Sequence, residues 1–486
     1  MPALTGTATG TPLPRIMMVS SEASPWAKSG GLADVLEALP KALAAAGHRV
    51  SVVIPRYMHA LAAPAERVID VLPITLGGAV YDTSILRSKQ DGVTIFYVEH
   101  AGIYGRDGLY GDQFGDYGDN HIRFAVLCKA ALEISRTLFP TDIYHCHDWQ
   151  AGLLPLYLKA FGTEPEFANA RTVMTIHNLG YQGIFPRAKM ADISLPDWLF
   201  RTDLIEFWGN INLLKAGLVY ADEITTVSRR YAEEIQTPEH GFGLDGLLRA
   251  RSESLIGIVN GVNYTRWNPE SDKALPENYS AAALEGKLAC KRELLREMGL
   301  PDRAIGRPLL GIVSRFAYQK GFDLIASIGH TLFQDDVHMV VLGNGDGQYE
   351  EYFRNLRASF PEKVALRIGY DDGLAHRIEA GSDIFLMPSR YEPCGLNQIY
   401  SLRYGTVPVV RATGGLDDTI DPSTGFKFTD YNGRALLETI RLACRAWEDR
   451  EAWTRMMRRG MAKDFSWDAS AAEYSRLYQN LHPFAG

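Results

Sequence analysis

The side chains best suited to chemistry lie in the segment 387–398, which reads Met-Pro-Ser-Arg-Tyr-Glu-Pro-Cys-Gly-Leu-Asn-Gln. Glu392 follows a short apolar run, 384–387, which is typical of a buried strand. A carboxylate between such a strand and a Pro-Cys-Gly bend is out of place in a core, and it suits hydrogen bonding to sugar hydroxyls. Cys394 could be a nucleophile, but no His or Asn nearby in the sequence would activate it, so we expect a buried packing residue.

Two cations, Arg315 and Lys320, follow another apolar run and precede a helical pattern. Two positive charges near one helix start could neutralise the phosphate of a leaving group. A surface Arg/Lys pair is the commoner outcome of such a spacing. Lys28 occupies a matching position in the first half of the chain, however, and this match favours a phosphate-binding role.

Two pairs of adjacent glycines precede predicted helices, in Lys28-Ser-Gly-Gly31 and in Thr413-Gly-Gly415. Adjacent glycines allow backbone N–H groups to approach an anion, and a helix N-terminus adds partial positive charge. The first pair would form a diphosphate site with Lys28, although it matches neither the Walker A loop nor the G-x-G-x-x-G fingerprint. Taken alone, a simple turn from strand to helix is the commoner explanation.

Polar residues also follow two neighbouring apolar runs in the first half, as His145-Cys-His-Asp148 and as His177. Asp148 and His177 supply directional acceptors and donors that suit sugar hydroxyls. His145 and His147 could suggest a metal site, but no third ligand has a fitting spacing and the chain has no D-x-D run. We therefore expect no metal.

Short β-branched apolar runs alternate with helical patterns along the whole chain, which predicts parallel sheets covered by helices on both faces. The pattern restarts after a polar stretch at 267–280, so we predict two domains with a boundary near Val259. Ligands of such sheets bind outside the carboxyl ends of the strands, so we expect the site in a cleft between the domains. Strands are predicted at 15–20, 49–54, 93–98, 142–145, 172–176, 223–227, 308–313, 338–342, 364–368, 384–387 and 407–410, and a helix at 32–46.

Composition places the chain in a broad class. Its 486 residues carry a formal net charge of -8, with 46% hydrophobic and 22% charged residues, which indicates a soluble globular protein of two or three domains and argues against nucleic-acid binding. Five scattered cysteines without a C-x-x-C pair indicate reduced thiols in the cytoplasm. We expect no signal peptide at 1–14 and no membrane span, because no basic start or long apolar run occurs.

In order along the chain, these motifs resemble those of the retaining glycosyltransferases that build glycogen and starch, and the match is close to the bacterial glycogen synthases that use ADP-glucose. The resemblance covers about residues 15–481. The motifs that carry it are Lys28-Ser-Gly-Gly-Leu-Ala-Asp-Val35, His147-Asp-Trp-Gln-Ala-Gly152, His177-Asn-Leu-Gly-Tyr-Gln-Gly183, Asn260-Gly-Val-Asn263, Ser314-Arg-Phe316, Gln319-Lys-Gly321, Arg390-Tyr-Glu-Pro-Cys-Gly-Leu396 and Thr413-Gly-Gly-Leu416.

The resemblance implies an α/β fold of the GT-B type, with two Rossmann-like doubly wound domains facing across a cleft. Residues 1–258 would form the acceptor-side domain, 259–460 the donor-side domain, and 461–486 a helix that crosses back to the first. It implies that glucose passes from ADP-glucose to the non-reducing 4-OH end of an α-1,4-glucan such as glycogen, with retention of configuration. No metal or other cofactor is implied, and the oligomeric state stays open.

The resemblance also implies roles for individual residues. Many related transferases carry a second Glu eight residues after the first, where this chain has Tyr400, so a contact to the ribose stays unassigned. Tyr370 would stack on the adenine. The implied catalytic residues are Glu392, His177, Arg315, Lys320 and Asp148; the donor-binding residues are Lys28, Gly31, Asn260, Arg315, Lys320, Tyr370, Cys394, Gly395, Leu396, Thr413, Gly414 and Gly415; and Asp34 and Gln319 would line the rest of the cleft.

Several other functions are compatible with parts of this pattern. A retaining two-domain transferase with a small acceptor, a UDP-glucose-using enzyme and a plastid starch synthase share most of the motifs, and no physical argument decides between ADP and UDP. A non-catalytic sugar-binding protein is disfavoured because Lys28, Arg315, Lys320 and Glu392 are all present. An NAD-dependent oxidoreductase is disfavoured because no complete G-x-G-x-x-G opens a strand–helix unit.

Overall fold

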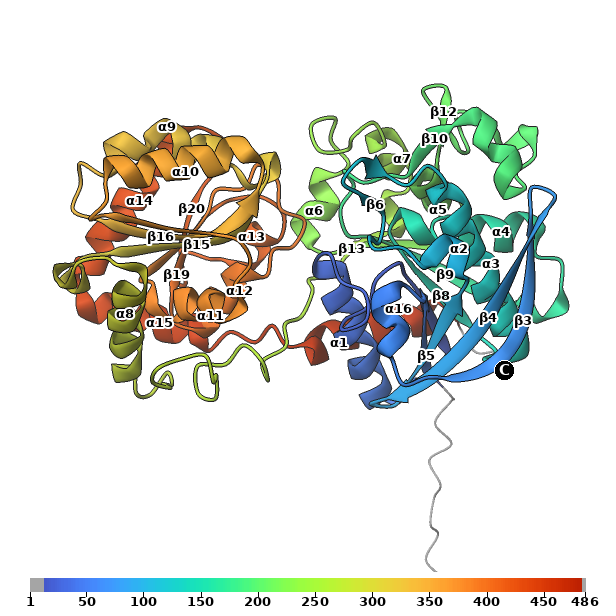
Figure 1. The fold of residues 1–486 in the computed structure, drawn as a ribbon, viewed down its shortest axis with the longest axis horizontal. Helices are drawn as coiled ribbons and strands as arrows, with labels where there is room; N and C mark the ends of the chain where they lie inside the picture. The colour runs from blue at the N-terminus through green and yellow to red at the C-terminus, as the bar shows by residue number, and fades with distance from the viewer. Residues whose placement is uncertain (1–12, 483–486) are drawn as a thin grey trace, which may run out of the picture. The chain divides into compact units, whose positions relative to one another are not determined.

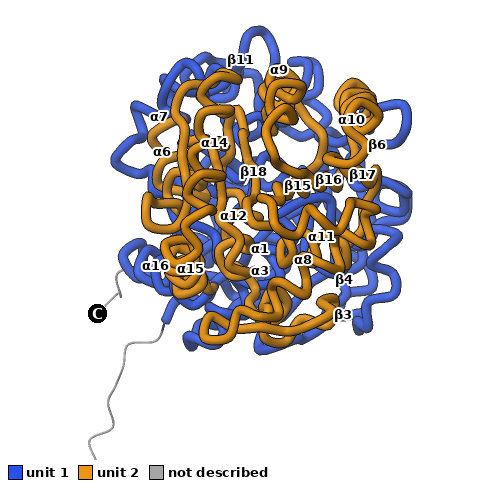
Figure 2. The backbone as a smooth tube through the Cα atoms, turned by 90° about the vertical axis from the view of Figure 1, so that its left-hand side faces the viewer, with its two compact units in different colours: residues 1–226, 235–261, 467–486 blue, residues 227–234, 262–466 orange. Residues whose placement is uncertain are grey.

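The computed structural model describes residues 13–482, which fall into two compact units (Figure 2). Unit 1 consists of Met1–Thr226, Ile235–Gly261 and Trp467–Gly486, and unit 2 of Val227–Glu234 and Val262–Ser466. The chain therefore crosses between the units four times. The sequence pattern did not predict the short excursion into unit 2 at Val227–Glu234. Most of the segment for which no signal peptide was expected, residues 1–12, lies outside the described residues.

Unit 1 contains a nine-stranded sheet in the order β14-β13-β9-β8-β1-β2-β5-β4-β3, a small sheet β10-β12-β11 and a hairpin β6-β7 (Figure 1). Strands β14 to β5 pair in parallel, as predicted, whereas β4 and β3 add an antiparallel edge that the sequence pattern did not predict. The bounds are β1 Ile16–Val19, β2 Val50–Pro55, β3 Glu66–Leu76, β4 Ala79–Gln90, β5 Val93–Glu99, β6 Gly111–Asp112, β7 Gly115–Asp116, β8 Ile143–His147, β9 Arg171–Ile176, β10 Ile184–Pro186, β11 Glu206–Phe207, β12 Asn210–Asn212, β13 Glu223–Thr226 and β14 Leu255–Gly257.

Helices cover both faces of the large sheet of unit 1. Ile16 and Met18 of β1 share one buried cluster with Leu36 of α1 and with Tyr474 and Tyr478 of α16. The last helix of the chain is thus part of the core of unit 1. Within residues 13–482, no helix is long and apolar enough to cross a bilayer. The helices of unit 1 are α1 Gly31–Ala45, α2 Ala101–Tyr104, α3 Asn120–Thr137, α4 Leu153–Phe161, α5 Leu213–Tyr220, α7 Asp245–Ala250 and α16 Trp467–Leu481.

Unit 2 is built on a six-stranded sheet in the order β17-β16-β15-β18-β19-β20. All neighbouring strands pair in parallel, so the predicted sheet of the second half is confirmed. The short last strand was not predicted, because three residues give no readable pattern. The bounds are β15 Leu309–Phe316, β16 His338–Gly345, β17 Val364–Ile368, β18 Ile384–Met387, β19 Val407–Arg411 and β20 Phe426–Phe428.

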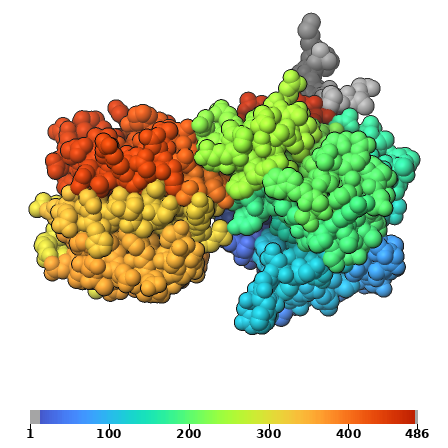
Figure 3. Space-filling model, turned by 90° about the horizontal axis from the view of Figure 1, so that it is seen from above, coloured from blue at the N-terminus to red at the C-terminus, as the bar shows by residue number. Residues whose placement is uncertain are grey.

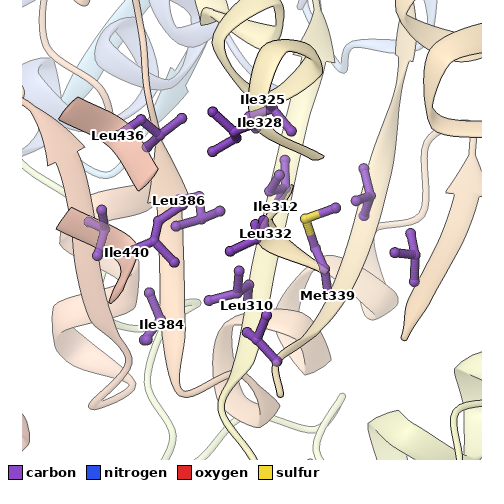
Figure 4. Packing of buried hydrophobic residues seen from close by; sticks show 14 of the residues in the cluster. Leu310, Ile312, Ile325, Ile328, Leu332, Met339, Ile384, Leu386, Leu436 and Ile440 are labelled. Atoms are coloured by element: carbon purple, nitrogen blue, oxygen red, sulfur yellow. The ribbon is translucent and has the colours of Figure 1, made fainter. Parts of the chain in front are cut away.

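Alternate residues of the unit 2 strands serve two separate cores. Leu310 and Ile312 of β15 pack with residues of α9 and α14, as Figure 4 shows. Leu309, one position earlier, packs with α8 and α11 on the opposite face. This alternation makes the sheet doubly wound, as predicted. The helices of unit 2 are α6 Arg229–Glu234, α8 Glu285–Met298, α9 Phe322–Leu332, α10 Gly347–Ser359, α11 Asp372–Gly381, α12 Asn397–Arg403, α13 Gly414–Thr419, α14 Gly433–Glu448 and α15 Arg450–Met461.

Helices α6 and α13 cap each other's N-termini. Asp418 of α13 accepts hydrogen bonds from the N–H groups of Arg229 and Arg230, at 2.6 and 3.0 Å. In return, Glu234 of α6 accepts from the N–H of Gly414 at 3.1 Å and from the Thr413 hydroxyl at 3.1 Å. Carboxylates satisfy the free donors of a helix start and complement its dipole. The excursion at Val227–Glu234 is therefore fastened at both of its ends to unit 2.

Tyr400, eight residues after Glu392, belongs to a partly buried aromatic stack. The ring of Trp267 lies between His376, at a centroid distance of 3.7 Å, and Tyr400, at 4.0 Å. Asp272 accepts from the Tyr404 hydroxyl at 2.5 Å and lies 2.6 Å from Nδ1 of His376. Tyr400 thus helps to pack the base of α12 against the polar stretch at 267–280.

Glu379 of α11 is a buried carboxyl near this stack, and its protonation should affect the stability of the protein. It is 1% exposed, and Oε1 has no hydrogen-bond partner among the described residues. Burial raises the pKa of Glu379 from 4.5 to about 8. A folded-state pKa above the unfolded value means that this group contributes most stability below about pH 4.5 and loses that contribution as the pH rises through about 8.

We therefore expect Glu379→Gln to leave the thermal midpoint unchanged at about pH 5 and to raise it at about pH 9. Glutamine keeps an acceptor for the Ser401 hydroxyl, which donates to Oε2 at 2.6 Å. Calorimetry of both proteins across this pH range measures the effect. Parallel stability curves for the two proteins would contradict the assignment.

Candidate active site

Two side chains at adjacent strand ends form the centre of the unit 1 site. Strands β8 and β9 are parallel neighbours, so Asp148 and His177 leave the sheet at the same edge. The Asp148 carboxylate accepts a hydrogen bond from the backbone N–H of His177 at 2.8 Å. Asp148 has a left-handed backbone, with φ 55°, which is uncommon for a residue other than glycine and recurs at functional sites. Burial raises the pKa of Asp148 to about 7, so its charge changes near neutral pH.

The ring of His177 is neutral and has a defined proton position. Burial lowers the pKa of His177 to about 3, and the pKa of His147 lies well below its usual value for the same reason. Nδ1 of His147 lies 2.9 Å from Nε2 of His177, so one of these two nitrogens carries the shared proton. Nε2 of His147 has no partner among residues 13–482. Because an unpaired buried N–H is costly, the proton belongs on Nδ1 of His147. His177 then keeps its own proton on Nδ1, where it can donate to a hydroxyl group.

The remaining ring, His145, links this pair to the end of the chain. Its Nε2 lies 2.5 Å from the Thr175 hydroxyl oxygen and its Nδ1 lies 2.7 Å from the hydroxyl oxygen of Tyr478 in α16. Both nitrogens are therefore occupied by protein groups. Among the described residues, no group of three or more His, Cys, Asp or Glu is arranged to hold a metal ion. The expectation of a metal-free site remains a prediction.

The loop that joins β1 to α1 is held by an internal carboxylate. Glu22 is 3% exposed and accepts hydrogen bonds from the Ser29 N–H at 2.7 Å and from the Ser29 hydroxyl at 2.6 Å. It also accepts from the Gly30 N–H at 3.3 Å and from the Tyr110 hydroxyl at 2.5 Å. One of the two glycine amides that the sequence pattern offered to a diphosphate, that of Gly30, is thus already bound to a protein anion, as is the neighbouring Ser29 amide. The prediction of an open amide therefore does not hold at Gly30 in this structure.

We expect Glu22→Gln to disturb this loop, because an amide NH2 group cannot accept from the donors that converge on Glu22. Loss of buried charge-assisted hydrogen bonds should lower the free energy of unfolding by about 1–3 kcal/mol. If the loop serves catalysis, kcat should fall by about tenfold in addition, as for a misplaced positioning group. Thermal melts and initial rates measure the two effects. Tyr110→Phe, which removes a single donor, is the matched control and should change both much less.

The other predicted residues of unit 1 lie around this loop and at the end of β14. Lys28 forms an ion pair with Asp34 at 2.6 Å, and both side chains are partly exposed. A Cβ atom added at Gly31 would meet nothing within 4 Å, so the first turn of α1 is open. Asn260 is 8% exposed, and its Oδ1 has no hydrogen-bond partner among the described residues. A buried acceptor without a partner is what a ligand donor would satisfy.

In unit 2, a cation and a carboxylate are held together at the ends of β15 and β18. Nζ of Lys320 donates to Oε2 of Glu392 at 2.6 Å, and the Ser389 hydroxyl donates to the same oxygen at 3.0 Å. Glu392 is 5% exposed. Gln319 fixes the backbone beside them, because its carbonyl accepts from the Arg390 N–H at 2.8 Å and its amide donates to the Tyr391 carbonyl. Lys320 and Glu392 are thus in direct contact, and Gln319 binds the backbone of the two residues before Glu392.

Two further predicted residues of unit 2 are exposed. The guanidinium of Arg315, near the end of β15, makes no hydrogen bond or ion pair with any described residue. Tyr370 is 83% exposed and follows β17, two strands away from β15 in the sheet. An unpaired cation and an exposed aromatic ring at one sheet edge are available to a ligand with phosphate and a flat ring.

The glycines of Thr413-Gly414-Gly415 allow this segment to pack closely against the backbone of Glu392 to Cys394. A Cβ at Gly414 would lie 1.9 Å from the Glu392 carbonyl oxygen. The Gly415 N–H donates to that same carbonyl at 3.1 Å, and the Gly414 N–H donates to Glu234. The prediction that these amides are open for a phosphate therefore does not describe the structure. They hold the segment 392–396, in which Cys394 is buried, as expected, and Gly395 is left-handed with φ 70°.

Comparison with known proteins gives the family. Residues 15–250 match the family model of the starch synthase catalytic domain, and residues 302–459 match that of glycosyl transferases group 1. The glycogen synthase of Koribacter versatilis is 50% identical over 473 residues, which is 96% of this chain and 97% of that protein. The chain belongs to the glycogen and starch synthase family. The glycogen synthase of an Anaeromyxobacter species is also 50% identical, over 481 residues that cover 96% of this chain and 99% of that protein.

Solved structures of related proteins agree with this membership. The catalytic domain of starch synthase IV from Arabidopsis thaliana, bound to ADP and acarbose, has 31% identity and a TM-score of 0.88, covering 97% of this chain and all of that one. A sucrose-phosphate synthase from Thermosynechococcus elongatus, at 19% identity and a TM-score of 0.58 over 96% of this chain and 99% of that chain, shares the fold. As a member of the glycogen and starch synthase family, the protein is a glycosyltransferase with two α/β domains of the GT-B type.

Within the family site, sequence reasoning missed several supporting residues. Glu22 precedes Lys28 by six residues, and no signal in the sequence showed that its carboxylate contacts the loop. His147 was considered as a metal ligand, whereas in the structure its ring is the hydrogen-bond partner of the His177 ring. Gln398 donates from its amide to the carbonyls of Cys394 and Gly395, both at 3.0 Å, and thereby fixes the bend after Glu392.

Proposed function

We propose that the enzyme transfers glucose from ADP-glucose to the non-reducing 4-OH end of an α-1,4-glucan, with retention of configuration and without a metal ion. The observation that carries the proposal is the pairing of Lys320 with Glu392 at 2.6 Å. A nucleotide sugar presents phosphate oxygens and sugar hydroxyls close together, and this pair offers a cation to the first and an acceptor to the second.

Each unit contributes groups with a distinct task. When the bond from the sugar C1 to the phosphate oxygen breaks, negative charge develops on the leaving ADP, and Lys320 and Arg315 stabilise it. Tyr370 stacks on the adenine ring. In unit 1, His177 is neutral, so it binds a sugar hydroxyl as a hydrogen-bond donor and supplies no charge. Asp148 fixes the main chain at His177 by accepting a hydrogen bond from its backbone N–H.

Retention follows if the acceptor attacks from the face that the phosphate leaves. The acceptor 4-oxygen forms the new bond to C1, and its proton passes to an oxygen of the departing phosphate. Glu392 holds the sugar hydroxyls during this step. An inverting reaction would instead need a carboxylate base on the opposite face.

Two relatives support the choice of substrates, because the Koribacter protein is named a glycogen synthase and the Arabidopsis starch synthase IV structure contains ADP and acarbose. A small acceptor and a UDP-glucose donor are the competing assignments. A cytoplasmic location is part of the proposal and suits the five free cysteines.

The decisive experiment compares initial rates with ADP-glucose and UDP-glucose, using glycogen and then fructose 6-phosphate as acceptors, in excess EDTA. We expect rapid glucan extension from ADP-glucose, unaffected by EDTA, and a product that an exo-hydrolase specific for α-1,4 linkages digests. Faster turnover with UDP-glucose would overturn the donor assignment. Activity abolished by EDTA and restored by Mg²⁺ would overturn the metal-free assignment, and transfer to fructose 6-phosphate alone would overturn the acceptor.

A further inference from the structure

An exposed tryptophan in unit 1 is held in a strained backbone conformation. Trp208 and Gly209 form the two-residue turn between β11 and β12, with φ values of 50° and 82°. Turns of this kind need positive φ at both positions and are normally made by Asn-Gly. A bulky aromatic residue there is an outlier, and Trp208 is 81% exposed. Strain of this type persists where the side chain serves a function.

The Trp208 ring is fixed from behind. It stacks on Phe207 at a centroid distance of 4.9 Å and an interplanar angle of 19°, and Phe207 itself is only 8% exposed. The loop around Gly243 lies close to both rings, because a Cβ added there would come within 3.0 Å of Phe207 and 3.4 Å of Trp208. The Gly209 N–H donates to the Glu206 carboxylate at 2.7 Å, which closes the turn. One side of the exposed ring is therefore packed against Phe207.

A buried amide ties this turn to the loop that begins at His177. Gln182 is 6% exposed; its Oε1 accepts from the Asn212 side chain of β12 at 2.6 Å. Its Nε2 donates to the carbonyls of Leu179 and Phe242, both at 3.1 Å. The loop 177–184, the strand β12 that follows the turn and the loop around Phe242 are thus joined through one buried side chain. They carry the exposed rings of Tyr181, at 56%, Trp208 and Phe242, at 39%.

We propose that Trp208 and Tyr181 form an aromatic platform that binds the α-glucan acceptor, several residues away from the chain end that receives glucose. The proposal rests on the proposed function and adds a binding surface to it. Flat amphipathic rings match the apolar C–H faces of glucose units, whose hydroxyls stay in water. The segment that contains β11 and β12 faces outward on the surface drawn in green in Figure 3, so a long polymer has access to it.

Continuity with His177 favours a glucan over other occupants of the platform. The loop 177–184 starts at the ring that donates to the sugar and ends in β10, which pairs with β12. The residues next to His177 in the sequence are therefore joined through β10 to the strand that follows the Trp208 turn.

The chain offers a test in which the turn is kept and the ring is lost. Trp208→Asn creates Asn-Gly, the preferred pair for this turn, so the hairpin should stay folded. Trp208→Tyr keeps a ring and should rescue binding. Trp198→Ala removes another exposed tryptophan of unit 1, 53% exposed and outside the three tied segments, and serves as the matched control.

Two measurements test whether the platform binds glucan. Maltoheptaose titrated without donor should change the tryptophan fluorescence of the wild type and of Trp198→Ala, but not that of Trp208→Asn. In steady-state assays, Trp208→Asn should raise KM for maltoheptaose by about tenfold, the loss of about one good stacking contact, with KM for ADP-glucose and kcat unchanged.

Each alternative outcome overturns the proposal. Equal fluorescence changes and equal KM values in Trp208→Asn and wild type would exclude the platform. A raised KM for ADP-glucose alone would assign the ring to the adenine instead. Because the fluorescence titration needs no turnover, it reads the platform even if the wild type makes no glucan, an outcome that would instead refute the proposed function.

Discussion

Lys320→Ala is expected to lower kcat by about 10²- to 10³-fold, the usual cost of removing a group that stabilises charge in the transition state. The substitution also leaves the Glu392 carboxylate, 5% exposed, with only the Ser389 hydroxyl among the partners seen on Oε2. An unpaired buried charge should lower the free energy of unfolding by about 3 kcal/mol. Initial rates at saturating donor and calorimetry measure the two effects separately.

Arg315→Ala separates catalysis from stability in the same site. The Arg315 guanidinium has no partner within residues 13–482, so its loss should not change the thermal midpoint. If it binds the leaving phosphate, kcat should still fall by about 10²-fold. Arg434→Ala, which removes an exposed ion pair with Glu438, is the inert control and should change neither quantity. For the first substitution, a Lys320→Ala enzyme that keeps most of its kcat would refute the assignment of Lys320 to the leaving phosphate.

Asp148→Asn is expected to lower kcat by about 10²-fold and to change the pH profile. Burial raises the pKa of Asp148 to about 7, so the wild-type carboxyl is neutral below that pH and charged above it. The charged form is the better acceptor for the backbone N–H of His177, which donates to Oδ1 at 2.8 Å. Wild-type kcat/KM should therefore rise with pH through about 7, whereas the asparagine enzyme should lack this step.

Rates measured between about pH 5 and 9 provide the test, with His145→Gln as a comparison in the same region. His145 contacts no substrate in the proposed site, and burial lowers its pKa to about 3, so its replacement should leave the step near pH 7 in place. A wild-type profile without that step, or an identical step in Asp148→Asn, would show that Asp148 does not titrate in catalysis.

The sequence predicted the parallel sheets well, because buried parallel strands read as continuous apolar runs with little ambiguity. Strands β17 and β18 lie at the predicted residues 364–368 and 384–387. The antiparallel edge of β3 and β4 was not predicted, because most of their side chains are at least partly exposed and β3 contains Pro73, so neither strand is a continuous apolar run. Position after a strand also placed the candidate side chains at the correct edges of the two sheets.

The partners of those side chains could not be predicted, because most of them come from distant segments. Glu234 is 180 residues away from Gly414, and Tyr478 is 333 residues away from His145. Glycine pairs allow an anion to approach, but they do not say whether it belongs to a ligand or to the protein. Here Glu22 and Glu234 occupy amides that the pattern assigned to phosphate.

The path of the chain between its units limits how the protein can be divided. A fragment that ends at Gly261 would lack α16, and with it Tyr474 and Tyr478 from the core of unit 1. The complementary fragment would lack Val227–Glu234 and leave the start of α13 without its cap. Neither half is therefore a self-sufficient domain for expression. The two fragments are instead suited to complementation, in which activity returns only when both are produced together and exchange these segments.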